Sequence, residues 1–213
     1  MKDANVYKAL RLKADGIIKA LKSRNMNGYY AETKKDALKK ALELIPEGSS
    51  IGYGGTVSID EIGLKQALSD GNYRLIRREE AKNPAEQHEK YKEIFDADFF
   101  LASVNAMSED GILVNIDGNS NRVSAISFGP KKVLFIVGMN KVAKDLDSAV
   151  SRARNIAAPA NAQRFDITTP CRELGSCMNC RSKDCICCNF LITRFQRDPE
   201  RIHVILVNDD LGF

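Results

Sequence analysis

The stretch KKVLFIVG, residues 131–138, decides the fold class. It is a continuous run of strand-forming residues bounded by Gly129-Pro130 on one side and Gly138 on the other. Such a run is typical of a strand in a parallel sheet whose two faces are both covered, because every side chain then meets an apolar layer. The stretch therefore predicts a strand buried on both faces of an α/β protein.

Helical and extended patterns alternate on both sides of this strand. A capping box, Thr33 with Asp36, opens one helix, and Ser58 with Glu61 is expected to open another. Asp110-Gly111 in SEDG is a strong signal for a hairpin turn between two strand-like runs. We expect helices over about 5–25, 33–45, from 58 onwards, 84–95 and 146–157, the last stopped near Pro159. We expect strands in SSIGYGG, residues 49–55, where the strand runs into the glycine-rich turn, and near 73–76, 99–106, 111–117, 189–195 and 202–207. This order predicts α/β layers around a largely parallel sheet with a mixed β-hairpin portion.

Composition limits the possible classes of protein. A chain of 213 residues that is 44% hydrophobic can fill one core, so we expect a single domain over 1–213. The net charge is +4, and the basic residues are interspersed with acidic ones, which gives little reason to expect a nucleic-acid surface. No apolar run approaches the ~20 residues of a membrane span, and the first residues do not resemble a leader, so we expect a cytoplasmic protein.

The glycine-rich turn IGYGGTVSIDEIG, residues 51–63, is the first candidate site. Its glycines let the backbone approach a ligand closely, and the following helix would point free N–H groups at a bound phosphate or carboxylate. The turn is neither a Walker A motif nor a dinucleotide GxGxxG, so no nucleotide motif is present. Purely steric needs also produce such turns, but the position at a strand's carboxyl end favours a site. We expect ligand contacts from Gly52, Gly54, Gly55 and Thr56.

The loop NIDGNSNR, residues 115–122, is the second candidate. Asn, Asp and Gly are ordinary turn formers, but a turn alone does not explain five polar side chains. An acid flanked by amides and an arginine at a strand end can orient hydroxyls, hold a carboxylate or act as a base. We expect Asp117, or else Glu61, to carry acid–base chemistry, with ligand contacts from Asn115, Asn119, Asn121 and Arg122.

The segment GMNK, residues 138–141, follows the KKVLFIVG strand directly. In a parallel sheet this strand end lies on the same edge as the glycine-rich turn and the loop near Asp117, so the three segments are expected to face one crevice. Lys141 would supply a catalytic cation and Asn140 a ligand contact, although a lone lysine in this position is usually a solvated charge. The sequence thus predicts a pocket for a small anionic or phosphorylated ligand.

All six cysteines lie between residues 171 and 188, with the spacing C-x5-C-x2-C-x4-C-x-C-C. This concentration fits a local thiol site in a reduced compartment better than a disulfide framework. Two cysteines separated by two residues, here Cys177 and Cys180, commonly bind one metal ion together. Zinc and an iron–sulfur cluster both suit thiolate ligands. Free or redox-active thiols are the alternative, and a catalytic cysteine lacks an evident base. We expect a cysteine-rich loop over 170–189. If it holds a metal, the expected ligands are Cys171, Cys177, Cys180 and Cys187, with Cys185 or Cys188 as alternatives to Cys187.

These residues together resemble the LUD (lactate utilisation) domain family. The resemblance runs through GYGGTVSIDEIGL, VNAMSEDGILVNIDGNSNRVSAISFGPKKVLFIVGMNKV, AAPANAQRF, the PC and GSC segments and HVILVNDDLGF. The family is similar to ribose-phosphate isomerases and CoA-transferases, which implies a three-layer α/β fold whose first glycine-rich turn receives a phosphate or CoA-like group. The resemblance further implies that Gly54, Gly55 and Thr56 cradle phosphate and that Asp117, Asn121 and Lys141 line the pocket.

Three functions follow as hypotheses. The resemblance implies a subunit that supports oxidation of lactate to pyruvate together with iron–sulfur partners, with a small anion in the strand-end crevice. A phosphate-ester or CoA-ester enzyme of the isomerase or acyl transferase type would use Asp117 or Glu61 as base or nucleophile. A non-catalytic, metal-binding scaffold would use the cysteines as a structural zinc site. The sequence does not decide whether the protein is an enzyme, and homo-oligomers are possible.

Overall fold

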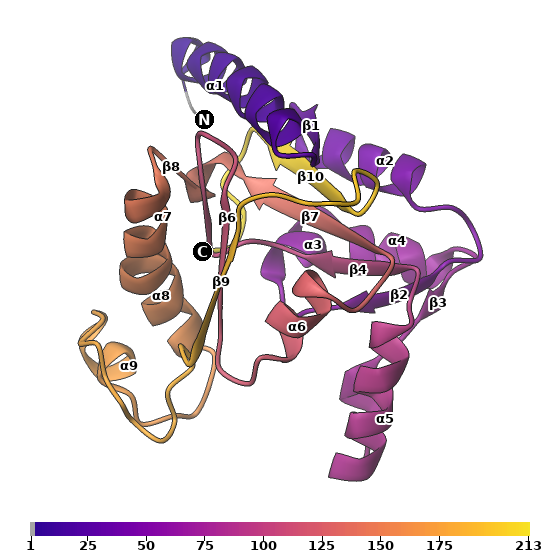
Figure 1. The fold of residues 1–213 in the computed structure, drawn as a ribbon, viewed down its shortest axis with the longest axis vertical. Helices are drawn as coiled ribbons and strands as arrows, with labels where there is room; N and C mark the ends of the chain where they lie inside the picture. Colours follow the sequence, from indigo (N-terminus) through magenta and orange to yellow (C-terminus); the bar gives the residue numbers. More distant parts are fainter. Residues whose placement is uncertain (1–2) are drawn as a thin grey trace.

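A six-stranded sheet forms the centre of the computed structural model, which describes residues 3–213 (Figure 1). The stretch quoted first is confirmed as its central strand, β7 (Lys132–Gly138), which lies between β10 (Ile202–Val207) and β4 (Phe99–Ala102). Every pairing is parallel, in the order β1-β10-β7-β4-β2-β3. The remaining strands are β1 (Asn27–Ala31), β2 (Ser50–Tyr53) and β3 (Arg74–Leu75). The predicted largely parallel α/β sheet is therefore confirmed.

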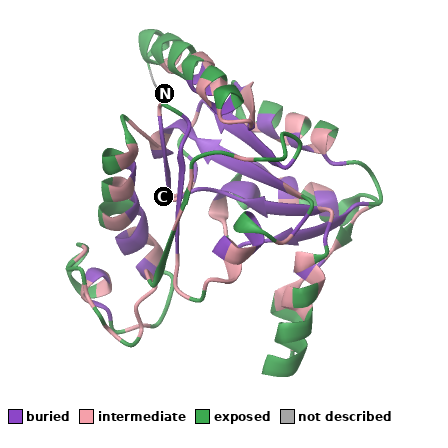
Figure 2. Cartoon of the chain, in the orientation of Figure 1, coloured by how far each residue is buried: buried purple, intermediate pink, exposed green. Residues whose placement is uncertain are grey.

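The two faces of β7 pack into two separate cores. Val133, Phe135 and Val137 belong to one core, and Leu134 and Ile136 belong to the other. All five side chains are fully buried, and Figure 2 shows buried residues along the central strands. Successive side chains of a strand point to opposite faces, so a strand between two apolar layers needs apolar residues at every position. This geometry explains why the stretch has no polar alternation.

Helices cover both faces of the sheet. On one face lie α1 (Ala4–Ser23), α5 (Pro84–Phe95) and α6 (Asn121–Ser127), and on the other lie α2 (Lys34–Leu44), α3 (Val57–Glu61) and α4 (Leu64–Asp70). The capping box of Thr33 and Asp36 is confirmed at the start of α2. No helix within residues 3–213 is long and apolar enough to cross a membrane.

A second, four-stranded sheet contains the predicted hairpin. Its order is β8-β5-β6-β9, formed by β8 (Val142–Ala143), β5 (Ala106–Ser108), β6 (Leu113–Asp117) and β9 (Asn189–Thr193). The expected single strand over 99–106 is wrong, because the chain leaves the main sheet after Ala102 and enters the second sheet at Ala106. The interruption, Ser103 to Asn105, contains the polar groups that turn towards the pocket described below.

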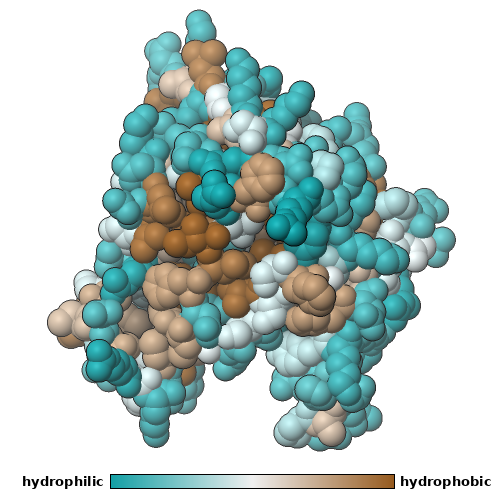
Figure 3. All heavy atoms as spheres, viewed as in Figure 1, coloured by the Kyte–Doolittle hydropathy of each residue, from teal (hydrophilic) through white to brown (hydrophobic). Residues whose placement is uncertain are grey.

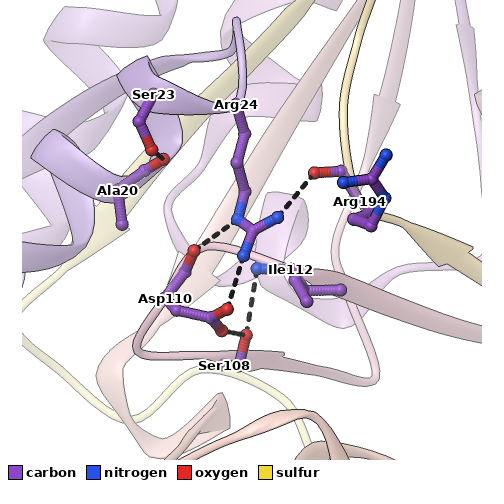
Figure 4. Close-up of polar contacts among 7 residues, drawn as sticks. All are labelled: Ala20, Ser23, Arg24, Ser108, Asp110, Ile112 and Arg194. Atoms are coloured by element: carbon purple, nitrogen blue, oxygen red, sulfur yellow. Dashed lines mark hydrogen bonds and ion pairs between the residues drawn. The ribbon is translucent and has the colours of Figure 1, made fainter.

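The hairpin turn is anchored to α1 (Figure 4). The guanidinium of Arg24 donates to the backbone oxygen of Asp110 at 2.5 Å, to its carboxylate at 2.5 Å and to the backbone oxygen of Arg194 at 2.9 Å. Gly111 adopts φ +85°, and a Cβ there would lie 3.0 Å from the backbone nitrogen of Leu21. Both the left-handed backbone and the close approach require glycine, so the Asp110-Gly111 signal is explained.

The predicted helix over 146–157 continues beyond its expected end. It runs through α7 (Leu146–Arg152), a π-helical turn (Ala153–Ala157) and α8 (Ala158–Ala162). The expected stop at Pro159 is wrong because the proline falls in the first turn of α8, after the wider π turn, where its missing N–H is tolerated. The extension carries Asn161 and Arg164 to the edge of the main sheet.

The segment after α8 contains the cysteine-rich loop. It begins with the short helix α9 (Pro170–Leu174) and ends at β9, the edge strand of the second sheet. Phe190 and Ile192 of β9 each remain 44% exposed, while Leu191 packs against the core. Figure 3 shows apolar atoms gathered on this face of the molecule.

Candidate functional site

A small cavity of about 80 Å³ lies where β2, β4 and β7 end, and we call it the inner pocket. Each strand is followed by a polar segment, because the chain must turn away from the sheet there. Thr56 follows β2, Ser103 and Asn105 follow β4, and Lys141 follows β7. The walls are completed by Arg122, Asn161, Arg164 and the last two residues, Gly212 and Phe213.

Lys141 is the most deeply placed charged group of the inner pocket, with 3% of its surface exposed. Its ammonium donates to the hydroxyls of Ser103 at 2.9 Å and Ser58 at 3.1 Å. Burial, reinforced by the nearby charge of Arg152, lowers the pKa of Lys141 to about 7, although Glu61 opposes the shift. A lysine with this pKa exists in both protonation states near neutral pH, which suits proton transfer and anion binding.

Arg122 of α6 crosses from the second sheet to the inner pocket. One of its nitrogens donates to Asn115 at 2.8 Å and the other to Asn105 at 2.9 Å, and further bonds reach the backbone oxygens of Ser103 and Ile116. Burial lowers the pKa of Arg122, against the opposing charge of Asp117. A Cβ at Gly54 would lie 2.9 Å from the Cδ atom of Arg122, so a glycine at position 54 leaves space for the arginine side chain.

Asp117 begins the loop that leads into α6. Its carboxylate accepts from the backbone N–H groups of Asn119 at 3.1 Å, Arg122 at 2.8 Å and Val123 at 3.1 Å. Three such bonds occupy much of the acceptor capacity of a carboxylate and hold the first turn of α6 in place. The geometry therefore gives Asp117 a clear part in positioning Arg122.

A larger cavity of about 480 Å³, which we call the vestibule, adjoins the inner pocket. Gly55, Arg122, Asn161 and Arg164 line both spaces. The vestibule adds Arg78, Asp117, Asn119 and Asn121 from the site side, and Cys185 and Ile186 from the cysteine-rich loop. The loop near 117 is thus brought beside the glycine-rich turn. This loop follows β6 of the second sheet, whereas the sequence predicts that it follows a strand of the parallel sheet.

Five of the predicted pocket residues line neither space: Gly52, Gly54, Glu61, Asn115 and Asn140. Gly52 lies within β2, where a Cβ would lie 2.8 Å from a methyl carbon of Ile94. Asn140 accepts from the Leu211 N–H at 3.1 Å, and the exposed Glu61 accepts from the Gly212 N–H at 2.9 Å. Gly52, Asn140 and Glu61 support helix packing and the final segment of the chain. The expected capping box of Ser58 and Glu61 is also wrong, because α3 begins after Thr56 and has no side-chain cap.

Several pocket residues were not predicted from the sequence. Arg164 donates to the Gly55 backbone oxygen at 3.0 Å and to Asn161 at 3.2 Å, which fixes it at the mouth of the inner pocket. Ser103 and Asn105 lie within the run 99–106, which the sequence predicts to be one strand. Asn115 was predicted as a ligand contact, but it is fully buried against Arg122, and its Nδ2 atom has no hydrogen-bond partner within residues 3–213.

Five of the six cysteines line a further cavity of about 150 Å³, which we call the cysteine cavity. They are Cys171, Cys177, Cys180, Cys185 and Cys187. Cys188 does not line it and is exposed. Burial and the neighbouring thiols raise the pKa of Cys187 to about 12. Within residues 3–213, no three histidine, cysteine or carboxylate side chains form a ready-made ligand set for a metal ion.

The fold and the two connected spaces define an α/β protein with a cation-lined pocket at the strand ends. The LUD domain model matches residues 14–207, so the chain belongs to the LUD domain family. A crystal structure of a DUF162 family protein from Deinococcus radiodurans has a similar fold, with a TM-score of 0.55 at 12% identity over 93% of this chain and 98% of that one. No match is found among curated proteins. The similarity to ribose-phosphate isomerases and CoA-transferases stays a prediction.

Proposed function

We propose that this protein binds a small 2-hydroxy or 2-oxo carboxylate, of the lactate and pyruvate type, in the inner pocket. In this proposal it acts as a subunit that supports oxidation of lactate to pyruvate together with iron–sulfur partners. Membership of the LUD domain family supports the substrate class. The observation that carries the proposal is the buried Lys141, whose hydrogen bonds go to neutral hydroxyls, beside the guanidinium groups of Arg122 and Arg164.

Charge and size favour a small acid. Burying a cation costs free energy unless an anion compensates it, so a group of cations around one pocket favours an anionic ligand. A cavity of about 80 Å³ is far below the ~300 Å³ at which pockets for drug-sized ligands begin. The inner pocket therefore suits a few-carbon acid, and a larger ligand would have to extend into the vestibule.

In this proposal the residues of the inner pocket have separate roles. Arg164, at the mouth, would hold the carboxylate, since a guanidinium group matches it in geometry. The terminal nitrogens of Arg122 already donate to four protein acceptors, so Arg122 would contribute its positive charge. Thr56 and Asn105 would orient the second oxygen of the acid. Neutral Lys141 would take the proton of the 2-hydroxyl group. The hydrogen on C2 would leave as a hydride, which carries both electrons, to a hydride-accepting redox group of the iron–sulfur partner. Asp117 would act through Arg122 as a positioning residue.

Ligand-induced stabilisation tests this proposal, because a ligand that binds the native state raises the melting temperature. We expect lactate and pyruvate to raise the melting temperature of the full chain and propionate, which lacks the 2-oxygen, to have less effect. Lys141→Met should weaken binding about 10- to 100-fold, the size expected for one charge-assisted hydrogen bond. Lys39→Met, at an exposed position of α2, is the matched control. Unchanged affinity in Lys141→Met would contradict the proposal.

A phosphate-ester or CoA-ester enzyme is the second candidate, and the vestibule favours it. Arg78 and Arg164 add cations to a space of about 480 Å³ that continues into the inner pocket. Ribose 5-phosphate and acetyl-CoA are therefore included as ligands in the same measurement. Stabilisation by either ester, without any by lactate or pyruvate, would favour this second function.

A further inference from the structure

We propose that the cysteine cavity binds an iron–sulfur cluster, held by four thiolates from the five cysteines that line it, with Cys187 among the four. This site is independent of the small-acid pocket, and neither proposal depends on the other. The proposal rests on the arrangement of the thiols, on the groups that surround them and on the size of the cavity.

Hydrogen-bond donors and a cation surround the sulfur atoms of the cysteine cavity. The Cys187 backbone N–H donates to the sulfur of Cys185 at 3.4 Å, and Arg154 places a guanidinium nitrogen 3.9 Å from the sulfur of Cys177. Hydrogen bonds and positive charge near a coordinated thiolate stabilise its negative charge, and they are levers by which proteins tune iron–sulfur clusters. A purely apolar core of thiols would have no need of Arg154.

The arrangement of the thiols favours a cluster over a single ion. A zinc ion needs four sulfurs at about 2.3 Å from one point, which leaves almost no space between them. The thiols here surround a cavity of about 150 Å³. A four-iron cluster keeps its ligands apart, since each thiolate binds a different iron and the inorganic core fills the space between them. Apolar side chains from Ile186 and Phe190 complete the lining and would shield such a core.

The cysteine cavity shares a wall with the vestibule. Cys185 and Ile186 line both spaces, and the segment packs so closely on the site loop that a Cβ at Gly118 would lie 3.1 Å from the Cα of Ile186. A cluster in this position would therefore lie directly behind the wall of the ligand space. Gly118 is the residue that permits this contact.

Anaerobic reconstitution of the full chain with ferrous iron and sulfide tests the proposal. We expect a brown protein with broad visible absorption and about four iron and four sulfide per chain, the content of a four-iron cluster in which each thiolate binds a different iron. Cys187→Ser should abolish the absorption, whereas Cys188→Ser should leave it unchanged, because Cys187 lines the cavity and Cys188 does not. Far-UV circular dichroism checks that each variant is folded.

Three results would overturn the proposal. The first is stoichiometric zinc in a colourless protein that takes up no iron, which would support the structural zinc site. The second is the pairing of four of the five cavity cysteines as two disulfides in anaerobically purified protein, seen by intact mass. The third is a full cluster signal in folded Cys187→Ser. The small-acid proposal has its own readout in the melting temperature, so each proposal can fail without the other.

Discussion

At the residue scale, single atoms decide whether the inner pocket can form. Gly54 follows β2 and has room for a hydrogen but not for a methyl group, because Arg122 passes 2.9 Å from the position of its missing Cβ. The sequence interpretation assigned the glycines to a phosphate cradle. In the structure Gly54 has a different role, because its missing side chain leaves space for the side chain of Arg122 to reach the pocket.

Gly54→Ala should therefore displace Arg122. We expect a loss of stability of about 1–3 kcal/mol from overpacking. We also expect a loss of lactate or pyruvate affinity of about tenfold, because the positive charge of Arg122 would move away from the carboxylate. Urea unfolding and ligand titration measure the two effects. Gly55→Ala is the matched control for stability, since its Cβ would meet only the flexible end of Arg78 at 3.4 Å. Equal stability of the two variants would show that the approach of Arg122 is not limiting.

At the element scale, the distance between helix α5 and strand β2 is set by Gly52. Its missing Cβ would lie 2.8 Å from Cγ2 and 3.0 Å from Cγ1 of Ile94, both of which are buried in the core between the helix and the sheet. A glycine within a strand is unfavourable unless another group approaches closely. The close packing of α5 explains this glycine without a ligand.

Gly52→Ala and Ile94→Ala should compensate each other. We expect Gly52→Ala to cost about 1–3 kcal/mol and Ile94→Ala about 2–5 kcal/mol, with the double variant losing less than their sum by about 1 kcal/mol or more. Urea unfolding of the four proteins completes the cycle. Gly16→Ala in α1 is the control, because no atom lies within 4 Å of its Cβ, and it should stabilise by about 0.5–1 kcal/mol. Strict additivity would contradict the close contact.

At the scale of the whole molecule, the buried Lys141 makes stability depend on pH. Its pKa is about 7 in the folded protein and 10.5 in its ordinary state. Between these values the unfolded chain binds more protons than the folded one, so the free energy of unfolding rises with pH in this window. Below pH 7 both states are protonated, and the cost of burying the charge is fully present.

Comparison of the native protein with Lys141→Met isolates this contribution. From pH 7 to pH 9 the free energy of unfolding of the native protein should rise relative to that of the variant by about 1.4 kcal/mol per pH unit. Urea unfolding of the ligand-free proteins at several pH values in this range measures the difference. Parallel pH profiles would show that Lys141 does not change its charge there. Lactate or pyruvate should reduce the dependence, because a bound anion favours the charged lysine.

The architecture of the sheet was largely predictable because its signals are local. The apolar run of β7, the capping box at Thr33 and the turn at Asp110-Gly111 each depend on neighbouring residues, and all three are confirmed. The errors occur where distant parts of the chain decide the outcome. The run over 99–106 splits because its second half pairs with β6 and β8, and the helix passes Pro159 because a π turn adjusts its backbone.

The sequence by itself determined the α/β class and the polar character of the segments at 54–56, 117–122 and 138–141, because composition and periodicity are properties of neighbouring residues. The family came from the resemblance of its motifs to those of the LUD domain family. Only the tertiary structure decided how these segments are used. It turned Asp117 towards the backbone of α6, buried Lys141 against two serines and brought Arg164 to the pocket. Burial and charge depend on groups far apart in the chain, so the pKa of Lys141 and the identity of its neighbours exist only in the folded protein.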